Sequence, residues 1–261
     1  MKKTKFFILM IGVTIISQSC NIMYRPNMQN VPLLSEKNEV RATIGPTDFQ
    51  GAFAVTDNLG IMVNGSLVNG QTQSNFDNFN SNYTTQVSKG SLIEAGVGYY
   101  KPLNENALFE VYGGVGAGKN SIVSSEFSNG ISFVNSSIYA NSSRFFVQPS
   151  IGFSNDYVDF AFSTRFVLQK YSKIDTLGYT TTMLYNDDLL NIDQPIFAFL
   201  EPALTLRIGY KYVKFHAQAM YSYKYNSEPL NYFPVNVNVG IHINIAGRFN
   251  AKAPKGKASL D

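Results

Sequence analysis

Apolar and polar residues alternate along most of this chain, from residue 38 to residue 246. The last and clearest example is VNVNVGIHINI, from Val235 to Ile245, where valine and isoleucine alternate with asparagine, glycine and histidine. A period of two is typical of a β-strand whose two faces have different surroundings, and this region has no clear 3.6-residue helical period. The alternation predicts ten strands: 38–45, 48–56, 60–69, 90–101, 107–120, 144–154, 157–171, 197–210, 213–226 and 233–246.

The expected connections differ in length on the two sides of the sheet. Four are tight turns rich in Asn, Asp, Gly or Pro, near 56–60, 102–107, 154–157 and 210–214. The other side carries three long polar segments, 70–89, 121–143 and 172–196, besides two short connections. Short turns at one end and long loops at the other are typical of bacterial outer-membrane barrels. The last strand is then expected to pair with the first and close the sheet.

The alternation does not say which way the apolar face points. In the predicted strand 213–226, for instance, Phe215 and Ala217 alternate with His216 and Gln218. Strands of about ten residues suit a tilted membrane crossing, and aromatic residues near strand ends suit the interfacial girdles of such barrels. These are Tyr99, Tyr100, Phe109, Tyr210, Tyr223 and Tyr225. We therefore predict an all-β fold, a closed antiparallel up-and-down β-barrel of about ten strands that is transmembrane; a soluble periplasmic barrel binding a hydrophobic ligand is the alternative.

The first twenty residues, MKKTKFFILMIGVTIISQSC, have the features of an export signal. A basic start precedes an apolar run of about eleven residues, which is too short to span a membrane. We expect residues 1–19 to be a signal peptide that is removed. Ser19-Cys20 resembles the bacterial lipobox, in which the cysteine is acylated, although Ser17 and Gln18 depart from its usual pattern. Lipidation of Cys20, with palmitate as the test label, is therefore expected.

Three lysines of this leader account for the formal charge of +3, so the chain without it has a net charge of zero. A neutral chain has no general affinity for nucleic acid, which we exclude as a partner. The expected organisation is a lipidated N-terminus and periplasmic linker at 20–37, the barrel at 38–246, and a basic periplasmic tail at 247–261.

Charged residues and both histidines of the chain fall on the polar phase of the predicted strands. In a narrow barrel such side chains pair across the interior and fill it. The predicted lumen-facing polar cluster comprises Glu94, Glu110, Arg165, Glu201, Arg207, His216 and His242. A wide open pore is therefore not expected.

His216 and His242 would lie on directly opposed residues if the last hairpin were centred near residue 229. Two imidazoles at that spacing could bind a metal or take part in acid–base chemistry. The sequence supplies no third ligand beside them, so hydrogen-bonded packing is the simpler interpretation. We predict no catalytic residue, no metal and no cofactor.

Gly114, Gly116 and Gly118 occupy the lumen-facing phase of one strand. The surrounding GGVGAGKN comes close to a phosphate-binding loop, but Asn120 stands where a hydroxyl is needed and no helical pattern follows. We expect the glycines to make room for long side chains that reach over from across the barrel.

The lipobox-like Ser19-Cys20 and the ten alternating strands together resemble bacterial lipid-anchored outer-membrane β-barrel proteins of unassigned activity. The resemblance covers nearly the whole chain and implies location rather than activity. It implies a non-enzymatic protein of the bacterial outer membrane with a structural or surface-interaction role. Its partners would be outer-membrane lipid and an envelope or extracellular protein bound through 70–89, 121–143 and 172–196. A narrow channel for ions or small solutes is the second hypothesis.

Overall fold

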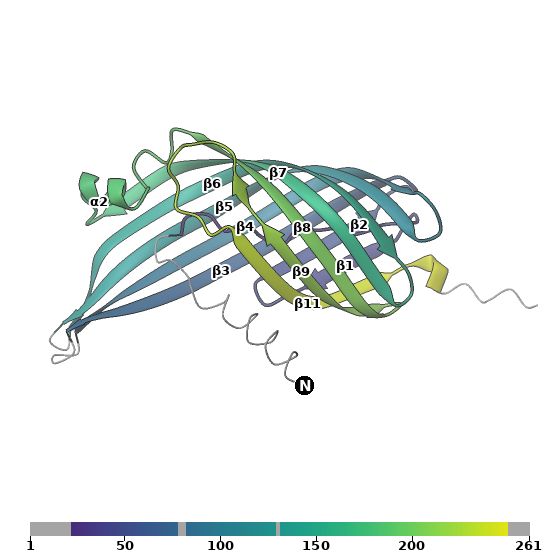
Figure 1. Cartoon of the computed structure of the whole chain (residues 1–261), viewed down its shortest axis with the longest axis horizontal. Coiled ribbons are helices and arrows are strands. Elements are labelled where there is room, and N and C mark those ends of the chain that lie inside the picture. Colours follow the sequence, from purple (N-terminus) through teal and green to yellow (C-terminus); the bar gives the residue numbers. More distant parts are fainter. Residues whose placement is uncertain (1–21, 78–81, 129–130, 250–261) are drawn as a thin grey trace, which may run out of the picture.

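The computed structural model describes residues 22–77, 82–128 and 131–249 of the chain. Leader residues 1–19, Cys20 and tail residues 250–261 lie outside the described part. Strands make up most of the chain (Figure 1). The elements are β1 (Val40–Ile44), β2 (Asp48–Ala54), β3 (Leu59–Asp77), β4 (Asn82–Pro102), β5 (Ala107–Ser128), β6 (Ile131–Ser154), β7 (Val158–Leu177), α2 (Thr181–Asn186), β8 (Ile196–Tyr210), β9 (Val213–Tyr221), β10 (Tyr223–Lys224), β11 (Val235–Ile245) and the 3₁₀ turn η1 (Gly247–Phe249).

The strands form one antiparallel sheet whose hydrogen bonding closes into a ring. Each strand pairs with its neighbours in sequence from β1 to β9, and β11 pairs with both β9 and β1. The seam is the predicted one, with Val40 opposite Ile245. β10 continues β9 along β8 after Ser222, so the two count as one of ten strands in the ring. All ten predicted strands are present, which confirms the all-β antiparallel prediction.

Two of the three predicted long loops are instead strand. β3 and β4 remain paired as far as Asp77 and Asn82, and β5 and β6 remain paired as far as Ser128 and Ile131. Segments 70–89 and 121–143 are therefore long hairpins, because polar residues alternate in a paired ribbon as readily as they fill a loop. Only 172–196 leaves the sheet, after Leu177, and it includes α2. We call this side of the ring the hairpin end and the opposite side, with the tight turns, the turn end.

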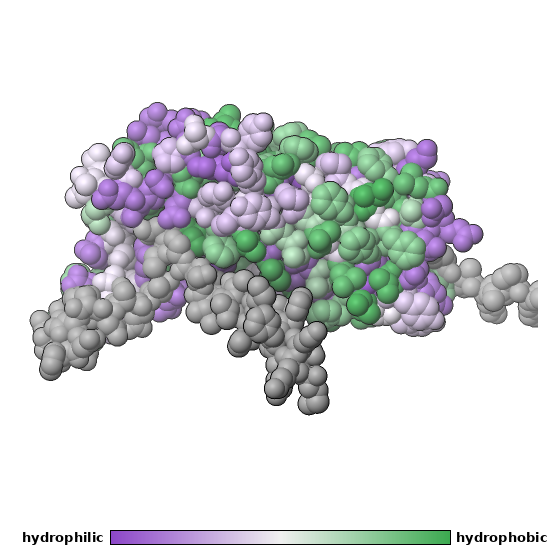
Figure 2. All heavy atoms as spheres, in the orientation of Figure 1, coloured by the Kyte–Doolittle hydropathy of each residue, from purple (hydrophilic) through white to green (hydrophobic). Residues whose placement is uncertain are grey.

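The ring is apolar outside and polar inside over the closed part. In β11, Val237, Val239 and Ile241 are 59%, 45% and 48% exposed, whereas Asn238 and His242, on the alternate face of the strand, are buried. Figure 2 shows apolar side chains gathered over β1, β8, β9 and β11, and polar ones towards the hairpin end. This is the reverse of a water-soluble protein, where large apolar side chains are the residue types most often buried.

Most of the aromatic residues predicted to lie near the strand ends do face outward, including Tyr99, Tyr210 and Tyr223. Tyr100 does not: it is fully buried and donates a hydrogen bond to the carbonyl oxygen of Thr56 at 2.5 Å. Tyr99 and Tyr100 are adjacent in a strand, so only one of them can point outward. Among the described residues, no helix is long and apolar enough to span a membrane.

Candidate functional site in the ring interior

Residues 22–35, which we call the plug segment, run through the inside of the ring. They were predicted to be part of a linker, but almost all of them are buried. A free linker would leave Met28, Val31 and Leu33 in water, whereas here each is fully or almost fully buried. The described residues of the predicted periplasmic linker at 20–37 are therefore mostly buried inside the ring rather than free in solvent. The missed signal was composition: the segment has the apolar and amide side chains of a buried strand.

The plug segment begins at the hairpin end. The amide of Met23 donates to the carbonyl oxygen of Asn231 at 3.1 Å, and the amide of Phe233 donates to that of Tyr24 at 3.0 Å. Asn231 and Phe233 belong to the connection between β10 and β11, on the hairpin side of the ring. Tyr24 thereby forms an isolated parallel bridge with Tyr232.

The plug segment ends at the turn end. Leu33 packs so closely against Gly152 that a Cβ there would lie 2.6 Å from Leu33 Cδ2. The amide of Leu34 donates to Glu110 Oε1 at 2.8 Å, and the amide of Ser35 donates to Glu39 Oε2 at 2.7 Å. The chain then turns into β1 at Val40. The segment thus crosses the ring from one end to the other.

Halfway along, the backbone of Gln29 is bonded by side chains of the ring. Its amide donates to Gln218 Oε1 at 2.7 Å, and Gln218 Nε2 donates to its carbonyl oxygen at 2.9 Å. The side chain of Gln29 also donates to the carbonyl oxygen of Glu201 at 2.6 Å and accepts from Ser163 Oγ at 2.7 Å. Buried backbone groups need such partners, so the amide-lined interior is matched to an extended peptide.

A charged cluster near the middle of the ring includes Asn27 of the plug segment. Glu94 Oε1 accepts from Arg144 Nη1 at 3.0 Å, and Glu94 Oε2 lies 3.5 Å from Arg165 Nη1. Asn27 donates to Glu94 Oε2 at 3.0 Å and accepts from Arg144 at 2.7 Å. One carboxylate therefore faces two guanidinium groups, with a plug amide between them. Arg144, the first residue of a predicted strand, was missed as a member of the cluster.

Gly116 makes this ion pair possible. It lies on β5 between Glu94 of β4 and Arg144 of β6, in register with both. A Cβ on Gly116 would lie 2.9 Å from Glu94 Cγ and 3.0 Å from Arg144 Cγ. The predicted role of the glycines is confirmed here, with one difference. The long side chains come from the two neighbouring strands rather than from across the ring.

Tyr24 anchors the part of the plug segment near the hairpin end. Its aromatic ring stacks on that of Phe199, with the two centroids 4.0 Å apart. Arg144 Cζ lies over the Tyr24 aromatic ring, 5.3 Å from its centroid. The Tyr24 side chain is buried, with the residue only 2% exposed. It donates to Glu201 Oε1 at 2.6 Å. The plug segment thus supplies the partner for another predicted interior carboxylate.

A second charged cluster lies towards the turn end. Asp159 accepts from Lys214 Nζ at 2.6 Å, and its other oxygen lies 3.8 Å from both Arg41 Nη1 and Arg207 Nη1. Arg207 also donates to the carbonyl oxygen of Val31 at 2.7 Å, which ties this cluster to the plug segment. Three cations surround a single Asp carboxylate, with Glu39 bonded to Arg41 at 2.7 Å.

The two histidines belong to this second cluster, but not as a facing pair. His216 lies opposite Gly240, and His242 lies opposite Lys214. The hairpin is centred one residue earlier than predicted, which moves the histidines to a diagonal. His216 Nδ1 accepts from Arg207 Nε at 3.1 Å, and His242 Nδ1 is hydrogen-bonded to Thr43 Oγ1 at 2.9 Å. Among the described residues, no group of three or more His, Cys, Asp or Glu side chains could hold a metal ion.

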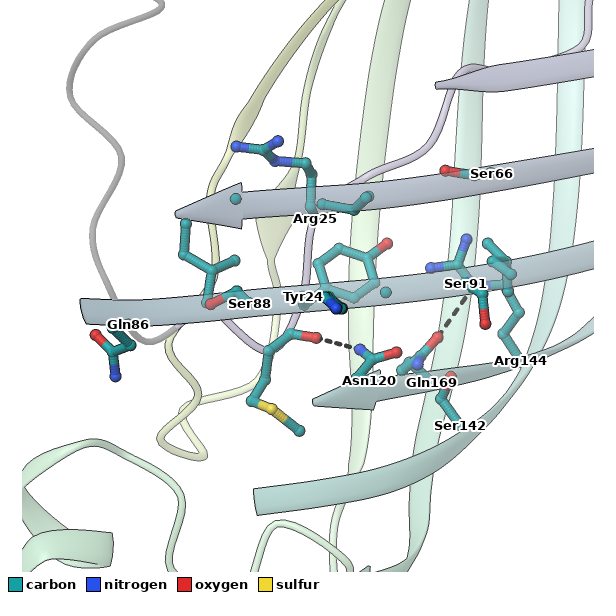
Figure 3. Close-up of a pocket in the computed structure, with 17 residues that line it drawn as sticks. Tyr24, Arg25, Ser66, Gln86, Ser88, Ser91, Asn120, Ser142, Arg144 and Gln169 are labelled. Atoms are coloured by element: carbon teal, nitrogen blue, oxygen red, sulfur yellow. Dashed lines mark hydrogen bonds between the residues drawn. The ribbon is translucent and has the colours of Figure 1, made fainter. Parts of the chain in front are cut away.

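A pocket lies at the hairpin end, directly above the start of the plug segment (Figure 3). Its cavity volume is about 70 Å³, and it is partly open to solvent. Met23 and Tyr24 form part of its lining, and Asn120 donates to the carbonyl oxygen of Met23 at 2.5 Å. The polar side chains that line it are Arg25, Ser66, Gln86, Ser88, Lys89, Ser91, Asn120, Ser142, Arg144 and Gln169.

All seven residues of the predicted lumen-facing polar cluster lie buried inside the ring. The structure brings them together in two groups. Glu94, Arg165 and Glu201 lie around Tyr24 and Asn27 of the plug segment. The other four lie towards the turn end: Glu110, Arg207, His216 and His242. Alternation placed them together on the polar face of the sheet but could not show what they contact. No protein-family model matches the chain, and no curated protein is significantly similar to it.

Proposed function

We propose that this protein is a β-barrel of a bacterial outer membrane, anchored by an acyl group on Cys20, with a structural or surface-interaction role and no enzymatic activity. The observation that carries the proposal is the inverted ring, apolar outside and charged inside. Exposed apolar patches on soluble monomers rarely exceed a few hundred Å². Here outward apolar residues follow nearly every strand of the closed part.

The dimensions of the apolar surface suit a bilayer. The apolar band of outer-membrane barrels is about 25 Å tall, and a tilted strand crosses with about 9–11 residues. β11 has 11 residues, with Val235 and Ile245 exposed at its two ends. A ring has no unpaired edge strand, so the strand-to-strand hydrogen bonding is contained within the sheet, as lipid requires. Exposed tyrosines near both ends of the band, such as Tyr210 and Tyr223, suit the interfaces.

The polar interior argues against the soluble alternative. A barrel that binds a hydrophobic ligand carries apolar side chains inside, whereas this ring is filled with buried Arg, Glu, Gln and Asn. The plug segment likewise argues against an open channel, because it crosses the whole interior and is bonded to the wall along its length. The hairpins β3–β4 and β5–β6 extend beyond the closed part and provide the surface for a partner (Figure 1).

Substitution of an outward residue by lysine separates a lipid-facing surface from a water-facing one. Val239→Lys lies near the middle of β11, and Gln71→Lys lies on the outer side of the hairpin extension. In lipid, lysine near the bilayer midplane costs about 2–4 kcal/mol, whereas in water it is nearly neutral. We expect Val239→Lys to reduce insertion into liposomes and folded stability there, with Gln71→Lys equal to wild type. Equal behaviour of the two variants would rule out the membrane proposal.

The anchor is tested separately. Cells fed radioactive palmitate should label the wild-type protein, and Cys20→Ala should abolish the label. A Cys20→Ala variant that still takes up palmitate would refute acylation at this residue, while leaving the barrel proposal intact.

A further inference from the structure

We infer that the plug segment enters the ring from the hairpin end, so that the chain before Ile22 and the chain after Ile245 leave from opposite ends of the ring. Combined with the proposed function, on which this part rests, the acyl anchor then lies in the leaflet on the hairpin side. The even number of strands alone would suggest the contrary, because β1 begins and β11 ends at the same place, with Val40 opposite Ile245.

The plug segment reverses that expectation because it adds one further crossing. At the hairpin end, Met23 and Tyr24 bind the connection between β10 and β11. At the turn end, Ser35 is hydrogen-bonded to Glu39. Between them Gln29 is bonded to strands β8 and β9. Figure 1 shows the described N-terminal residues and η1 at opposite ends of the ring.

Chain length excludes a return to the turn end. Cys20 lies two residues before Ile22, and these two steps along the chain span at most about 7 Å. A strand of 11 residues such as β11 is about 37 Å long, or more than about 25 Å along the ring axis when tilted. An anchor at residue 20 is therefore held at the hairpin end.

Tag accessibility in intact and permeabilised cells tests the membrane arrangement. One short epitope is placed in three separate variants: between Asn21 and Ile22, in the β3–β4 connection between Asn78 and Phe79, and at Glu105 in the turn between β4 and β5. We expect the Asn21–Ile22 tag and the β3–β4 tag to have the same accessibility to antibody in intact cells. The Glu105 tag should have the opposite accessibility. An N-terminal tag that follows the Glu105 tag would overturn the inference.

Distances in the purified protein test the threading without reference to a membrane. In a Cys20→Ser background, spin labels are placed at Ile22→Cys with either Glu105→Cys at the turn end or Glu228→Cys at the hairpin end. We expect the 22–105 distance to exceed the 22–228 distance by about 10 Å or more. The reverse order would refute the threaded plug, whether or not the ring is in lipid. If the order holds but all three tags respond alike in cells, the membrane proposal fails and the threading stands.

Discussion

Glu94 and Arg144 form a buried ion pair across an intervening strand, with Oε1 and Nη1 3.0 Å apart although β5 separates their strands. Gly116, the β5 residue that faces both, has no side chain to keep them apart. The same carboxylate also accepts from Asn27 of the plug segment and lies near Arg165. The Glu94 carboxylate therefore links the strands of the ring to the plug segment.

Loss of the Glu94 charge should be among the most damaging single changes. Glu94→Gln leaves the buried guanidinium groups of Arg144 and Arg165 without their carboxylate, and breaking such a buried pair typically costs about 3–5 kcal/mol. Chemical unfolding of the reconstituted protein, followed by circular dichroism, measures the change. Glu105→Gln, in an exposed turn, is the matched control and should unfold like wild type. Equal unfolding midpoints for the two variants would contradict the central role of Glu94.

A single methyl group at Gly116 should also destabilise the ring. In Gly116→Ala the new Cβ would lie within about 3 Å of both Glu94 and Arg144, and overpacking of this kind costs about 1–3 kcal/mol. Gly113→Ala on the same strand is the control, because its nearest neighbour would lie 3.8 Å away. The same unfolding measurement distinguishes them. If Gly113→Ala proves the more destabilising, the explanation for the glycine is wrong.

The sequence predicted the wall of the ring and its polar inner face, but not the plug segment. Strict alternation fixes which residues share a face, so Glu94 and His242 could be assigned to the polar side and all ten strands located. Polar segments such as 70–89 have the composition of loops, because serine, threonine and glutamine alternate without a hydrophobic marker. The plug segment was missed because its partners lie far along the chain, as Gln29 and Gln218 do. Hydrogen bonding between such distant residues leaves no local period to detect.

Gln218 should be needed for the position of the plug segment. Its side-chain amide makes both hydrogen bonds to the backbone of Gln29, in the manner of a neighbouring strand. Gln218→Leu keeps the bulk but leaves a buried N–H and a buried carbonyl oxygen unpaired, at about 1–3 kcal/mol each. We expect lower unfolding stability and faster amide hydrogen exchange at Gln29. Gln71→Leu, at an exposed position, should change neither quantity.

The two histidines should not bind zinc. Each is bonded through Nδ1 to a neighbour, and the surrounding cations Arg41, Arg207 and Lys214 repel a divalent metal. Zinc added to chelator-treated protein should leave the thermal unfolding temperature of wild type unchanged. It should also have no effect on the double variant His216→Ala/His242→Ala, which serves as the reference. A zinc-dependent rise in wild type that is absent from the double variant would establish a metal site after all.

The plug segment should keep the ring electrically silent. Purified wild-type protein in a planar bilayer is expected to give no conductance steps over a range of voltages. Deletion of residues 22–34 removes the peptide that crosses the interior and leaves a wall lined by Arg, Glu and Gln side chains, which water and ions can enter. Such a variant should give steps, provided that its β-sheet content by circular dichroism equals that of wild type. Steps from wild type would revive the channel hypothesis, because ions would then have to pass beside an intact plug.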